Sequence, residues 1–248
     1  MNVSPLSVTL IFPDGSKKEE ETLSLNEHNL EIHINGKKIL SLVCTDSNLM
    51  ELVAGRLLTS GIIEKKADIA DIRFCETKQR AFVTLHEEIL WQENQSAEPS
   101  CCTNNRQLLQ NADITDLPVL KTADWKNEWI FALTKEFSKD STIHTHTAGT
   151  HRCILSQEGK TVFSAEDIGR HNALDKAVGY MLLNDIPQEK AILFTSGRVP
   201  VDMTEKVIRA KVPVLASKSV PTAQSAALAR KHNLTLICRA WNDSFDLI

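Results

Sequence analysis

Residues 191–216, AILFTSGRVPVDMTEKVIRAKVPVLA, contain a complete strand–loop–helix–strand unit. The apolar run 191–195 predicts a buried strand, and residues 201–210 predict a helix that opens just after Pro200. Residues 214–216 predict the next strand. Because a helix joins the two strands, the unit is typical of a parallel sheet that is covered by helices.

The same alternation continues on both sides of this unit. Residues 222–232 predict a helix and 234–238 a strand, while Glu158-Gly159 predicts the turn of a hairpin over 154–163. Further helices are predicted at 125–137 and 172–183. The predicted fold class is therefore α/β, with a layered C-terminal α/β domain over residues 117–248 and a largely parallel sheet.

Residues 1–90 predict a smaller N-terminal α+β domain. Asn35-Gly36 is a strong hairpin signal, because both turn positions need a positive φ. Thr45, Asp46 and Ser47 are candidate N-caps for a helix that ends at Gly61. The predicted strands are residues 8–12, which end at the turn Pro13-Asp14-Gly15, and residues 31–34, 39–43, 69–75 and 81–85.

Residues 91–116 predict a mobile connection, because the stretch ENQSAEPSCCTNNRQ is polar and shows no periodicity. It carries Cys101 and Cys102, whereas most of the other cysteines lie in apolar, strand-like segments and are predicted to be inert packing groups. An exposed thiol on a mobile segment can visit a partner's active site and return. The residues leave open whether the pair has this role or is incidental.

Composition and charge exclude several classes of protein. The net charge of -4 argues against a broad basic face for duplex nucleic acid. No apolar stretch is long enough to span a membrane, and the charged run 17–21 is unlike a secretory signal. Six cysteines in a chain of this length without such a signal predict reduced thiols and a cytoplasmic protein.

Three loops between a predicted strand and the next helix combine small residues with a cation, which is Arg170, Arg198 or Lys218. Loops at the carboxyl ends of strands offer free backbone N–H groups, and together the three could hold phosphates without a Walker motif. The alternative is that the glycines only shape turns and the cations are solvated. The candidate ligand-binding residues in and beside these loops are Gly169, Arg170, His171, Asn172, Lys176, Ser196, Gly197, Arg198, Ser217, Ser219, Pro221 and Thr222.

The stretch THTAGTHRC at 145–153 is rich in possible metal ligands, with His144 just before it. A zinc-dependent base deaminase would show His-x-Glu and a later Pro-Cys-x-x-Cys. In this stretch His146 is followed at the second position by Ala148, and no Cys-x-x-Cys occurs anywhere in the sequence. No zinc or other metal is therefore predicted. Thr147, Gly149 and His151 are instead expected to line the phosphate site or to form a hydrogen-bonded turn.

Five segments in the C-terminal half resemble the FdhD/NarQ family of formate dehydrogenase accessory proteins. They are HTAGTHR at 146–152, EDIGRHNALDK at 166–176, SGRV at 196–199, SKSVPT at 217–222 and LTLI at 234–237. The N-terminal stretch 35–63 is similar to the same family. The resemblance therefore covers nearly the whole chain, with the segments in the family's order and spacing.

The resemblance implies a sulfurtransferase whose C-terminal domain has a cytidine-deaminase-like fold without zinc. Such a protein accepts sulfur as a cysteine persulfide from a cysteine desulfurase. It passes the sulfur to the molybdenum bis-guanine-dinucleotide cofactor, of which GDP is a mimic, for the maturation of formate dehydrogenase. The resemblance also implies a homodimer. The alternative is a non-catalytic chaperone that binds the cofactor without transferring sulfur.

The resemblance gives the catalytic role to Cys101 and Cys102, and it is here that the sequence departs from the family. The family usually has Cys-x-x-Cys in this segment. Cys101 matches the first cysteine, Asn104 stands in place of the second, and Cys102 has no assigned counterpart. Adjacent cysteines can form a disulfide only within a strained ring, so reductive release of sulfur is expected to need an external thiol.

Overall fold

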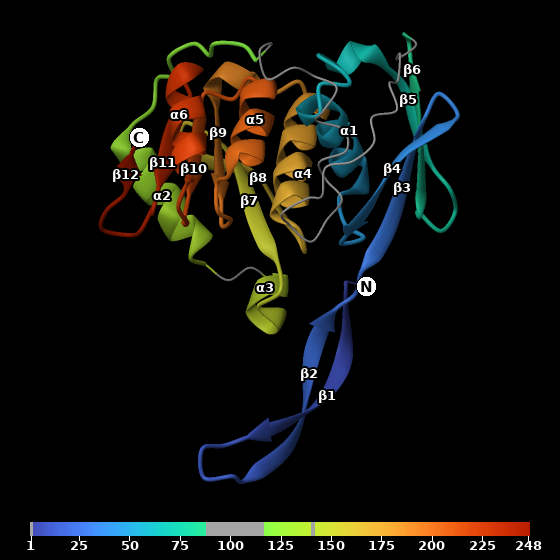
Figure 1. Ribbon diagram of the computed structural model, residues 1–248, viewed down its shortest axis with the longest axis vertical. Coiled ribbons are helices and arrows are strands. Elements are labelled where there is room, and N and C mark those ends of the chain that lie inside the picture. Colours follow the sequence, from blue (N-terminus) through green and yellow to red (C-terminus); the bar gives the residue numbers. More distant parts are fainter. Residues whose placement is uncertain (1, 88–116, 140–141) are drawn as a thin grey trace.

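The computed structural model describes residues 2–87, 117–139 and 142–248, which form a mixed α/β protein with three sheets in these ranges. The expected connection 91–116, with Cys101 and Cys102, lies outside the described residues. Strands β1 (Val3–Ile11) and β2 (Lys17–Leu25) pair antiparallel and form an arm that projects from the body (Figure 1). The predicted turn at its tip is confirmed, with Gly15 at φ 82°. The charged run 17–21 is therefore part of an exposed strand.

The second sheet has the strand order β4-β3-β6-β5. Asn35 and Gly36 have φ values of 47° and 83°, which confirms the predicted hairpin between the first two of its strands. The elements of this part of the chain are β3 (His28–Ile34), β4 (Lys37–Cys44), α1 (Leu49–Thr59), a 3-10 turn (Lys66–Asp68), β5 (Ile69–Phe74) and β6 (Arg80–Leu85).

Helix α1 does not begin at any of the predicted caps. Its N-cap is Asn48, in a left-handed conformation and without a side-chain capping bond. The prediction of Thr45, Asp46 or Ser47 is wrong, and the first of these residues is engaged by a distant partner instead. The Thr45 N–H and hydroxyl both lie within 3.2 Å of the Asp167 carboxylate.

The third sheet has six strands in the order β12-β11-β10-β9-β7-β8. β9, β10 and β11 are parallel, as predicted, but β7 is antiparallel to both of its neighbours and β12 is antiparallel to β11. β7 and β8 form the predicted hairpin about Glu158-Gly159. The prediction of a largely parallel sheet is wrong at both sides, because β7 also pairs antiparallel with β9, and β12 pairs antiparallel with β11. The strands are β7 (His151–Gln157), β8 (Lys160–Asp167), β9 (Ala191–Thr195), β10 (Val214–Ser217), β11 (Thr235–Cys238) and β12 (Asp246–Leu247).

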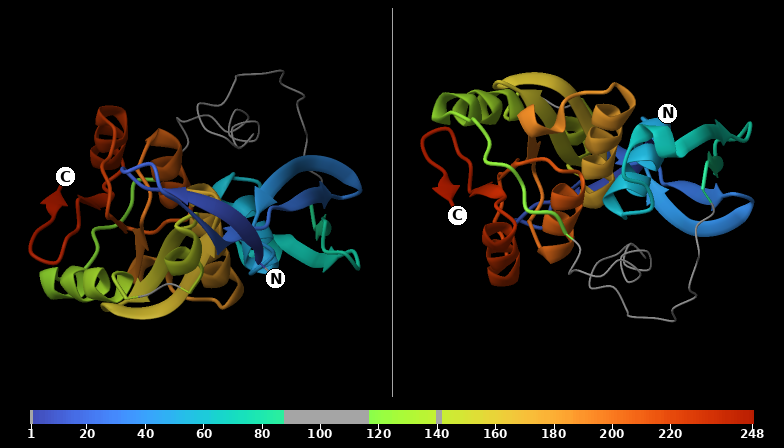
Figure 2. Two further views of the ribbon diagram at one scale, coloured as in Figure 1. Left: turned by 90° about the horizontal axis from the view of Figure 1, so that it is seen from below. Right: turned by 90° about the horizontal axis from the view of Figure 1, so that it is seen from above.

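Helices cover both faces of this sheet. Helix α2 lies on one side and helices α5 and α6 on the other (Figure 2). Successive strand residues alternate between the two cores, so that Ile192 and Phe194 pack with α2 while Leu193 packs in the opposite core. The helices of this half are α2 (Asn127–Phe137), α3 (Thr142–Thr147), α4 (Arg170–Leu183), α5 (Val201–Arg209) and α6 (Ala223–Lys231), and a 3-10 turn (Gln188–Lys190) precedes β9.

Helices α1 and α4 join the two halves of the chain through an unusually close contact. A Cβ on Gly179 would fall on the backbone carbonyl of Glu51, and one on Gly55 would fall on that of Asp175. The two glycines therefore allow the helix backbones to touch. The apolar side chains around these glycines form one continuous core with side chains of the four-stranded and six-stranded sheets.

Candidate functional site

The loops that follow β8, β9 and β10 meet at one edge of the six-stranded sheet. Within this edge the Ser217 hydroxyl donates a 2.7 Å hydrogen bond to the Gly197 carbonyl, and the Val199 N–H donates to the Val220 carbonyl at 3.0 Å. β8 runs in the same direction as β9, because β7 is antiparallel to both. The predicted meeting of the three loops is therefore confirmed, and we call this place the carboxyl edge.

Arg170 connects the first loop to the second. Its Cβ and Cδ both lie 2.9 Å from where a Cβ on Gly197 would stand, so the side chain crosses over this glycine. The Arg170 Nε is buried and has no hydrogen-bond partner among the described residues. The guanidinium of Arg170 is thus held at the carboxyl edge with a donor left for another molecule.

His151 lies beside Arg170 and is held by the second loop. Its Nδ1 is 3.2 Å from the Ser196 hydroxyl oxygen, which also accepts a bond from the Arg152 N–H. Burial lowers the pKa of His151, and the positive charge of Arg170 lowers it further. A neutral imidazole therefore lines the edge beside the guanidinium.

His171 is buried in the first turn of α4, with 3% of its surface exposed. Burial, followed by the positive charges of Lys206 and Arg170, lowers the pKa of His171 to about 2. Its Nε2 is 3.3 Å from the carboxylate of Asp202. This contact is not an ion pair, because the imidazole is neutral at neutral pH. Neither ring nitrogen of His171 has a hydrogen-bond partner among the described residues.

Acid should destabilise the protein through His171. Its pKa rises from about 2 in the folded chain to 6.5 in the unfolded chain, so the unfolded state binds more protons between these values. The free energy of unfolding should therefore fall below pH 6.5, by about 1.4 kcal/mol at pH 5.5 from this residue alone. Urea denaturation at pH 7.5 and 5.5 checks this, since His171→Gln should lose about that much less stability than the wild-type chain. An equal loss in both proteins would mean that His171 is not a buried neutral group.

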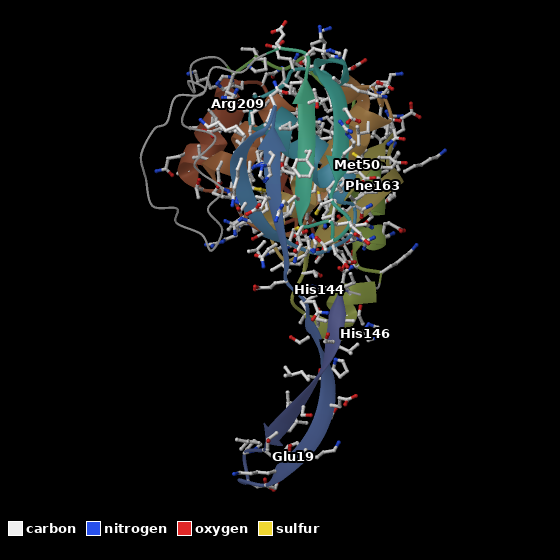
Figure 3. The ribbon with its side chains drawn as sticks, turned by 90° about the vertical axis from the view of Figure 1, so that its right-hand side faces the viewer. Glu19, Met50, His144, His146, Phe163 and Arg209 are labelled. Carbon is white, nitrogen blue, oxygen red and sulfur yellow. The ribbon has the colours of Figure 1, made fainter. Side chains whose placement is uncertain are left out.

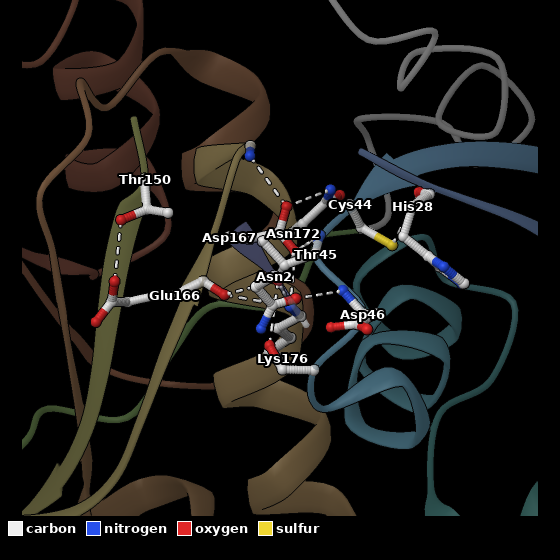
Figure 4. A network of polar contacts seen from close by, with 12 residues as sticks. Asn2, His28, Cys44, Thr45, Asp46, Thr150, Glu166, Asp167, Asn172 and Lys176 are labelled. Atoms are coloured by element: carbon white, nitrogen blue, oxygen red, sulfur yellow. Dashed lines mark hydrogen bonds and ion pairs between the residues drawn. The ribbon is translucent and has the colours of Figure 1, made fainter. Parts of the chain in front are cut away.

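Asp167 is the centre of the first loop (Figure 4). One oxygen of its carboxylate accepts bonds from the Gly169 N–H and the Asn172 side-chain amide, at 3.0 and 2.9 Å. The other oxygen is 2.7 Å from the Lys176 ammonium and also accepts from Thr45. The carboxylate, which is fully buried, thus shapes the loop, opens α4 and ties both to the N-terminal half.

Two predicted ligand-binding residues belong to this network. Lys176 is fully buried, and its ammonium donates to the Thr45 hydroxyl at 2.7 Å. Asn172 is also buried, and its amide donates to the Val43 carbonyl at 2.8 Å. In this structure neither side chain reaches the surface of the carboxyl edge. The expectation that they touch the ligand is therefore corrected to a role in joining β4 to α4.

Thr147 and Gly149 lie beside the arm and not among the three loops. A Cβ on Gly149 would meet Leu25 of β2 at 2.6 Å, and the Thr147 hydroxyl donates to the Ile143 carbonyl within α3. Of the two roles expected for these residues, the hydrogen-bonded turn is the one that the structure has, since the Gly149 N–H donates to the Thr147 hydroxyl at 3.2 Å. Helix α3 was not predicted from the sequence. Its His144 and His146 lie close to the root of the arm (Figure 3).

The third loop has both internal and exposed parts. Ser217 is fully buried, and Thr222 caps α6 by accepting a bond from the Ser225 N–H at 3.1 Å. Pro221 forms an isolated bridge with Val199. Arg198 is exposed and Ser219 is half-buried, so these two residues of the predicted set have side chains that can reach a ligand without rearrangement.

The described cysteines differ in their surroundings. Burial raises the pKa of the Cys44 and Cys238 thiols to about 12 and raises that of Cys153 as well, so these three are the predicted inert packing groups. Cys75 is an exception. It is half-buried, and a hydrogen bond with the Thr77 hydroxyl at 3.3 Å lowers the pKa of its thiol.

Two residues of the edge were missed by the sequence analysis. Glu166 accepts bonds from the Thr150 hydroxyl at 3.0 Å and from the His144 N–H at 3.2 Å, so it fixes the start of β7 and helix α3. Arg152 donates through Nε to the Ser164 hydroxyl at 2.8 Å. Both residues lie within the segments that resemble the FdhD/NarQ family. Their positions near the end of a strand could have indicated that they belong to the edge.

Comparison with known proteins supports the family resemblance that the sequence segments show. The sequence model of the FdhD/NarQ family matches residues 25–247. The chain belongs to the FdhD/NarQ family. It is 33% identical over 241 residues to the sulfur carrier protein FdhD of Halalkalibacterium halodurans, covering 94% of this chain and 89% of that one. It is 30% identical over 240 residues to the protein of the same name from Bacillus subtilis, covering 95% and 92%.

A solved structure shares the fold. The crystal structure described as that of a formate dehydrogenase accessory protein from Desulfotalea psychrophila matches with a TM-score of 0.81 and 23% identity, over 100% of this chain and 97% of that one. This likeness supports the mixed α/β fold of the FdhD/NarQ protein. In the part of the chain that the structure describes, no helix is long and apolar enough to cross a membrane.

Proposed function

We propose that this FdhD/NarQ protein is a sulfur carrier that serves the maturation of formate dehydrogenase. In this proposal it receives sulfur from a cysteine desulfurase and delivers it to the molybdenum bis-guanine-dinucleotide cofactor, which is its cargo. Family membership and the names of the relatives support the transfer of sulfur. The carboxyl edge supports the binding of a phosphate-bearing ligand.

The observation that carries the ligand assignment is the position of Arg170 over Gly197. A guanidinium whose buried Nε has no partner in the described ranges lies where two loops approach each other, and Arg198 adds an exposed cation on the second loop. Planar guanidinium groups bind phosphate oxygens through paired N–H donors. A diphosphate that joins a guanine nucleoside to a pterin has this chemistry.

Cys101 is the proposed sulfur carrier, as expected from the family motif. Its thiolate attacks the terminal sulfur of the desulfurase persulfide, the sulfur–sulfur bond of that persulfide breaks, and the desulfurase cysteine leaves as a thiolate. The product is a persulfide on Cys101. Delivery of the sulfur as sulfide then requires two electrons, which external thiols supply, since Asn104 replaces the second cysteine of the family motif. A thiolate attacks the Cys101 sulfur, the sulfur–sulfur bond of the persulfide breaks, and sulfide leaves to the molybdenum of the cargo. A second thiol reduces the mixed disulfide that remains on Cys101 and is released with the first thiol as a disulfide.

Sulfur loading of the cysteines tests this proposal. After incubation with a cysteine desulfurase and cysteine, intact-mass measurement should show wild-type protein that has gained the mass of one sulfur atom. Cys101→Ser should gain none, while Cys75→Ser, a control thiol on another loop, should gain as much as the wild type. Wild-type protein that gains no sulfur would contradict the carrier function and favour the non-catalytic chaperone.

Removal of the Arg170 guanidinium should weaken the binding of guanine nucleotide. Because it removes charge-assisted hydrogen bonds, Arg170→Ala should lose at least ~1.5 kcal/mol of GDP binding free energy, about a tenfold increase in Kd. Calorimetric titration of both proteins checks this, with Arg230→Ala on the exposed face of α6 as the control. Unchanged GDP affinity in Arg170→Ala would show that the nucleotide binds elsewhere.

Three further parts of the proposal follow from the family. The C-terminal half is expected to share the cytidine-deaminase-like arrangement, and β8-β7-β9-β10-β11 with α4, α5 and α6 is compatible with it. The carrier is expected to act in the cytoplasm, as a homodimer. It is expected to hold its cargo without zinc.

A further inference from the structure

A second recess opens beside the carboxyl edge, at the C-terminal end of α2. It has a volume of about 180 Å³, and its polar lining consists mainly of Ser138, Lys139, His144, Thr150, Arg152 and Ser196. Ser196 also belongs to the second loop of the edge, so the recess and the Arg170 loops are neighbours. The volume is enough for several water molecules, at ~30 Å³ each in the liquid, and so for a phosphate group.

Among the residues that the structure describes, cations outnumber carboxylates around this recess. Lys139 and Arg152 line it, and Lys218 reaches its rim by donating a 3.2 Å bond to the Ser138 hydroxyl. The two carboxylates near it in the described ranges are already engaged. Glu136 pairs with Lys139 at 2.9 Å, and Glu166 accepts from Thr150 and from the His144 N–H.

The Arg152 guanidinium is held in place before any ligand arrives. Its Nε donates to Ser164, its Nη1 lies 3.4 Å from the Lys139 carbonyl, and its plane lies 5.4 Å from the centre of the Phe137 ring. A guanidinium has five N–H donors, and these two bonds within the described residues engage two of them. The remaining donors suit the oxygens of a phosphate, and a side chain that is already fixed loses little entropy on binding.

Lys218 gives independent support. Its ammonium lies 5.2 Å from the centre of the Trp241 ring, and partial burial lowers its pKa. An ammonium that has been withdrawn from water is stabilised by an anion that enters beside it. The ring of Trp241, which is 49% exposed, keeps the side chain turned toward Ser138 and the recess.

We propose that this recess binds a diphosphate, as a second anion subsite next to the one at Arg170. The subsite itself stands on the geometry of Lys139, Arg152 and Lys218. Only the source of the diphosphate rests on the proposed function, since a cofactor with two dinucleotides carries two diphosphates. A free diphosphate has the same chemistry and is the other possible source.

Calorimetric titration of the full-length chain with inorganic pyrophosphate tests the subsite. Arg152→Met, which keeps the aliphatic packing against Phe137, should weaken pyrophosphate binding about tenfold, the scale of a lost charge-assisted hydrogen bond. Lys139→Ala should weaken it severalfold, and because the Lys139 side chain is 73% exposed this variant keeps the fold. Lys135→Ala, an exposed control on the same helix, should bind like the wild type.

The outcomes separate the subsite from the nucleotide assignment. Pyrophosphate affinity that stays unchanged in both Arg152→Met and Lys139→Ala would overturn the subsite. Affinity that is lost in Arg170→Ala, and not in these two variants, would also overturn it. GDP that competes with pyrophosphate, while guanosine does not, supports a nucleotide as the source of the diphosphate. GDP that fails to compete overturns that source. If Arg170→Ala leaves GDP binding unchanged, the proposed nucleotide site fails, whereas the pyrophosphate result still decides the subsite.

Discussion

Asp167→Ala should lower the free energy of unfolding by about 3–5 kcal/mol, which is the usual cost of removing one partner from a buried ion pair. The substitution leaves the Lys176 ammonium buried, with Thr45 and the Glu166 carbonyl as its remaining partners. It also removes the acceptor of the Gly169 N–H, so the start of α4 loses its anchor. Both effects act on the contact between the two halves of the chain.

Urea denaturation measures this loss, and an exposed ion pair provides the matched control. Glu136→Ala breaks the pair with Lys139 on the surface of α2, and should cost no more than about 1 kcal/mol, because solvent screens such pairs. A loss from Asp167→Ala as small as that from Glu136→Ala would contradict the central position of Asp167. Asp167→Asn should fall between the two, since it keeps an acceptor but loses the charge.

Gly179→Ala should destabilise the protein by about 3 kcal/mol, although alanine is the better helix former by about 1 kcal/mol. The new Cβ would overlap the backbone carbonyl of Glu51 and lie 2.8 Å from the Gly55 nitrogen. A backbone cannot rotate away as a side chain can. Helices α1 and α4 must therefore separate, which opens gaps in the core that both helices share.

Helix propensity and steric overlap predict opposite signs for the change in the free energy of unfolding on Gly179→Ala. Lys135→Gly, at an exposed position within α2, should cost about 1 kcal/mol and so calibrates helix propensity in this protein. Thermal or urea denaturation measures the free energy of unfolding of both variants. The Lys135→Gly value gives the effect of helix propensity, and the Gly179→Ala value shows whether steric overlap exceeds it. A Gly179→Ala protein as stable as the wild type, or more stable, would show that α1 and α4 do not touch at their backbones.

Local signals in the sequence predicted most of the secondary structure. Asn35-Gly36 predicted its hairpin because the turn geometry depends on those two residues alone. The N-cap of α1 could not be predicted in the same way, because Thr45 bonds to Asp167, which is 122 residues away. The turn at Glu158-Gly159 predicted the antiparallel pair of β7 and β8, but no local signal showed that β7 also pairs antiparallel with β9.

The candidate site was predicted in part. The three loops share one edge because β8, β9 and β10 point the same way, and Arg170 and Arg198 stand there as expected. Asn172, Lys176 and Gly179, however, lie at a spacing of i, i+4 and i+7 on the face of α4 that turns toward the N-terminal half of the chain, where they contact β4, Thr45 and α1 in turn. A fully buried lysine is rare, so residue type suggested a ligand where the structure has an internal ion pair.

The most direct test of a nucleotide site at the carboxyl edge is a crystal structure of the full-length protein soaked with GDP. We expect the diphosphate beside Arg170 and Gly197, with Arg198 and Ser219 within hydrogen-bonding reach, and no displacement of Asp167 or Lys176. GDP bound away from the loops after β8, β9 and β10 would contradict it.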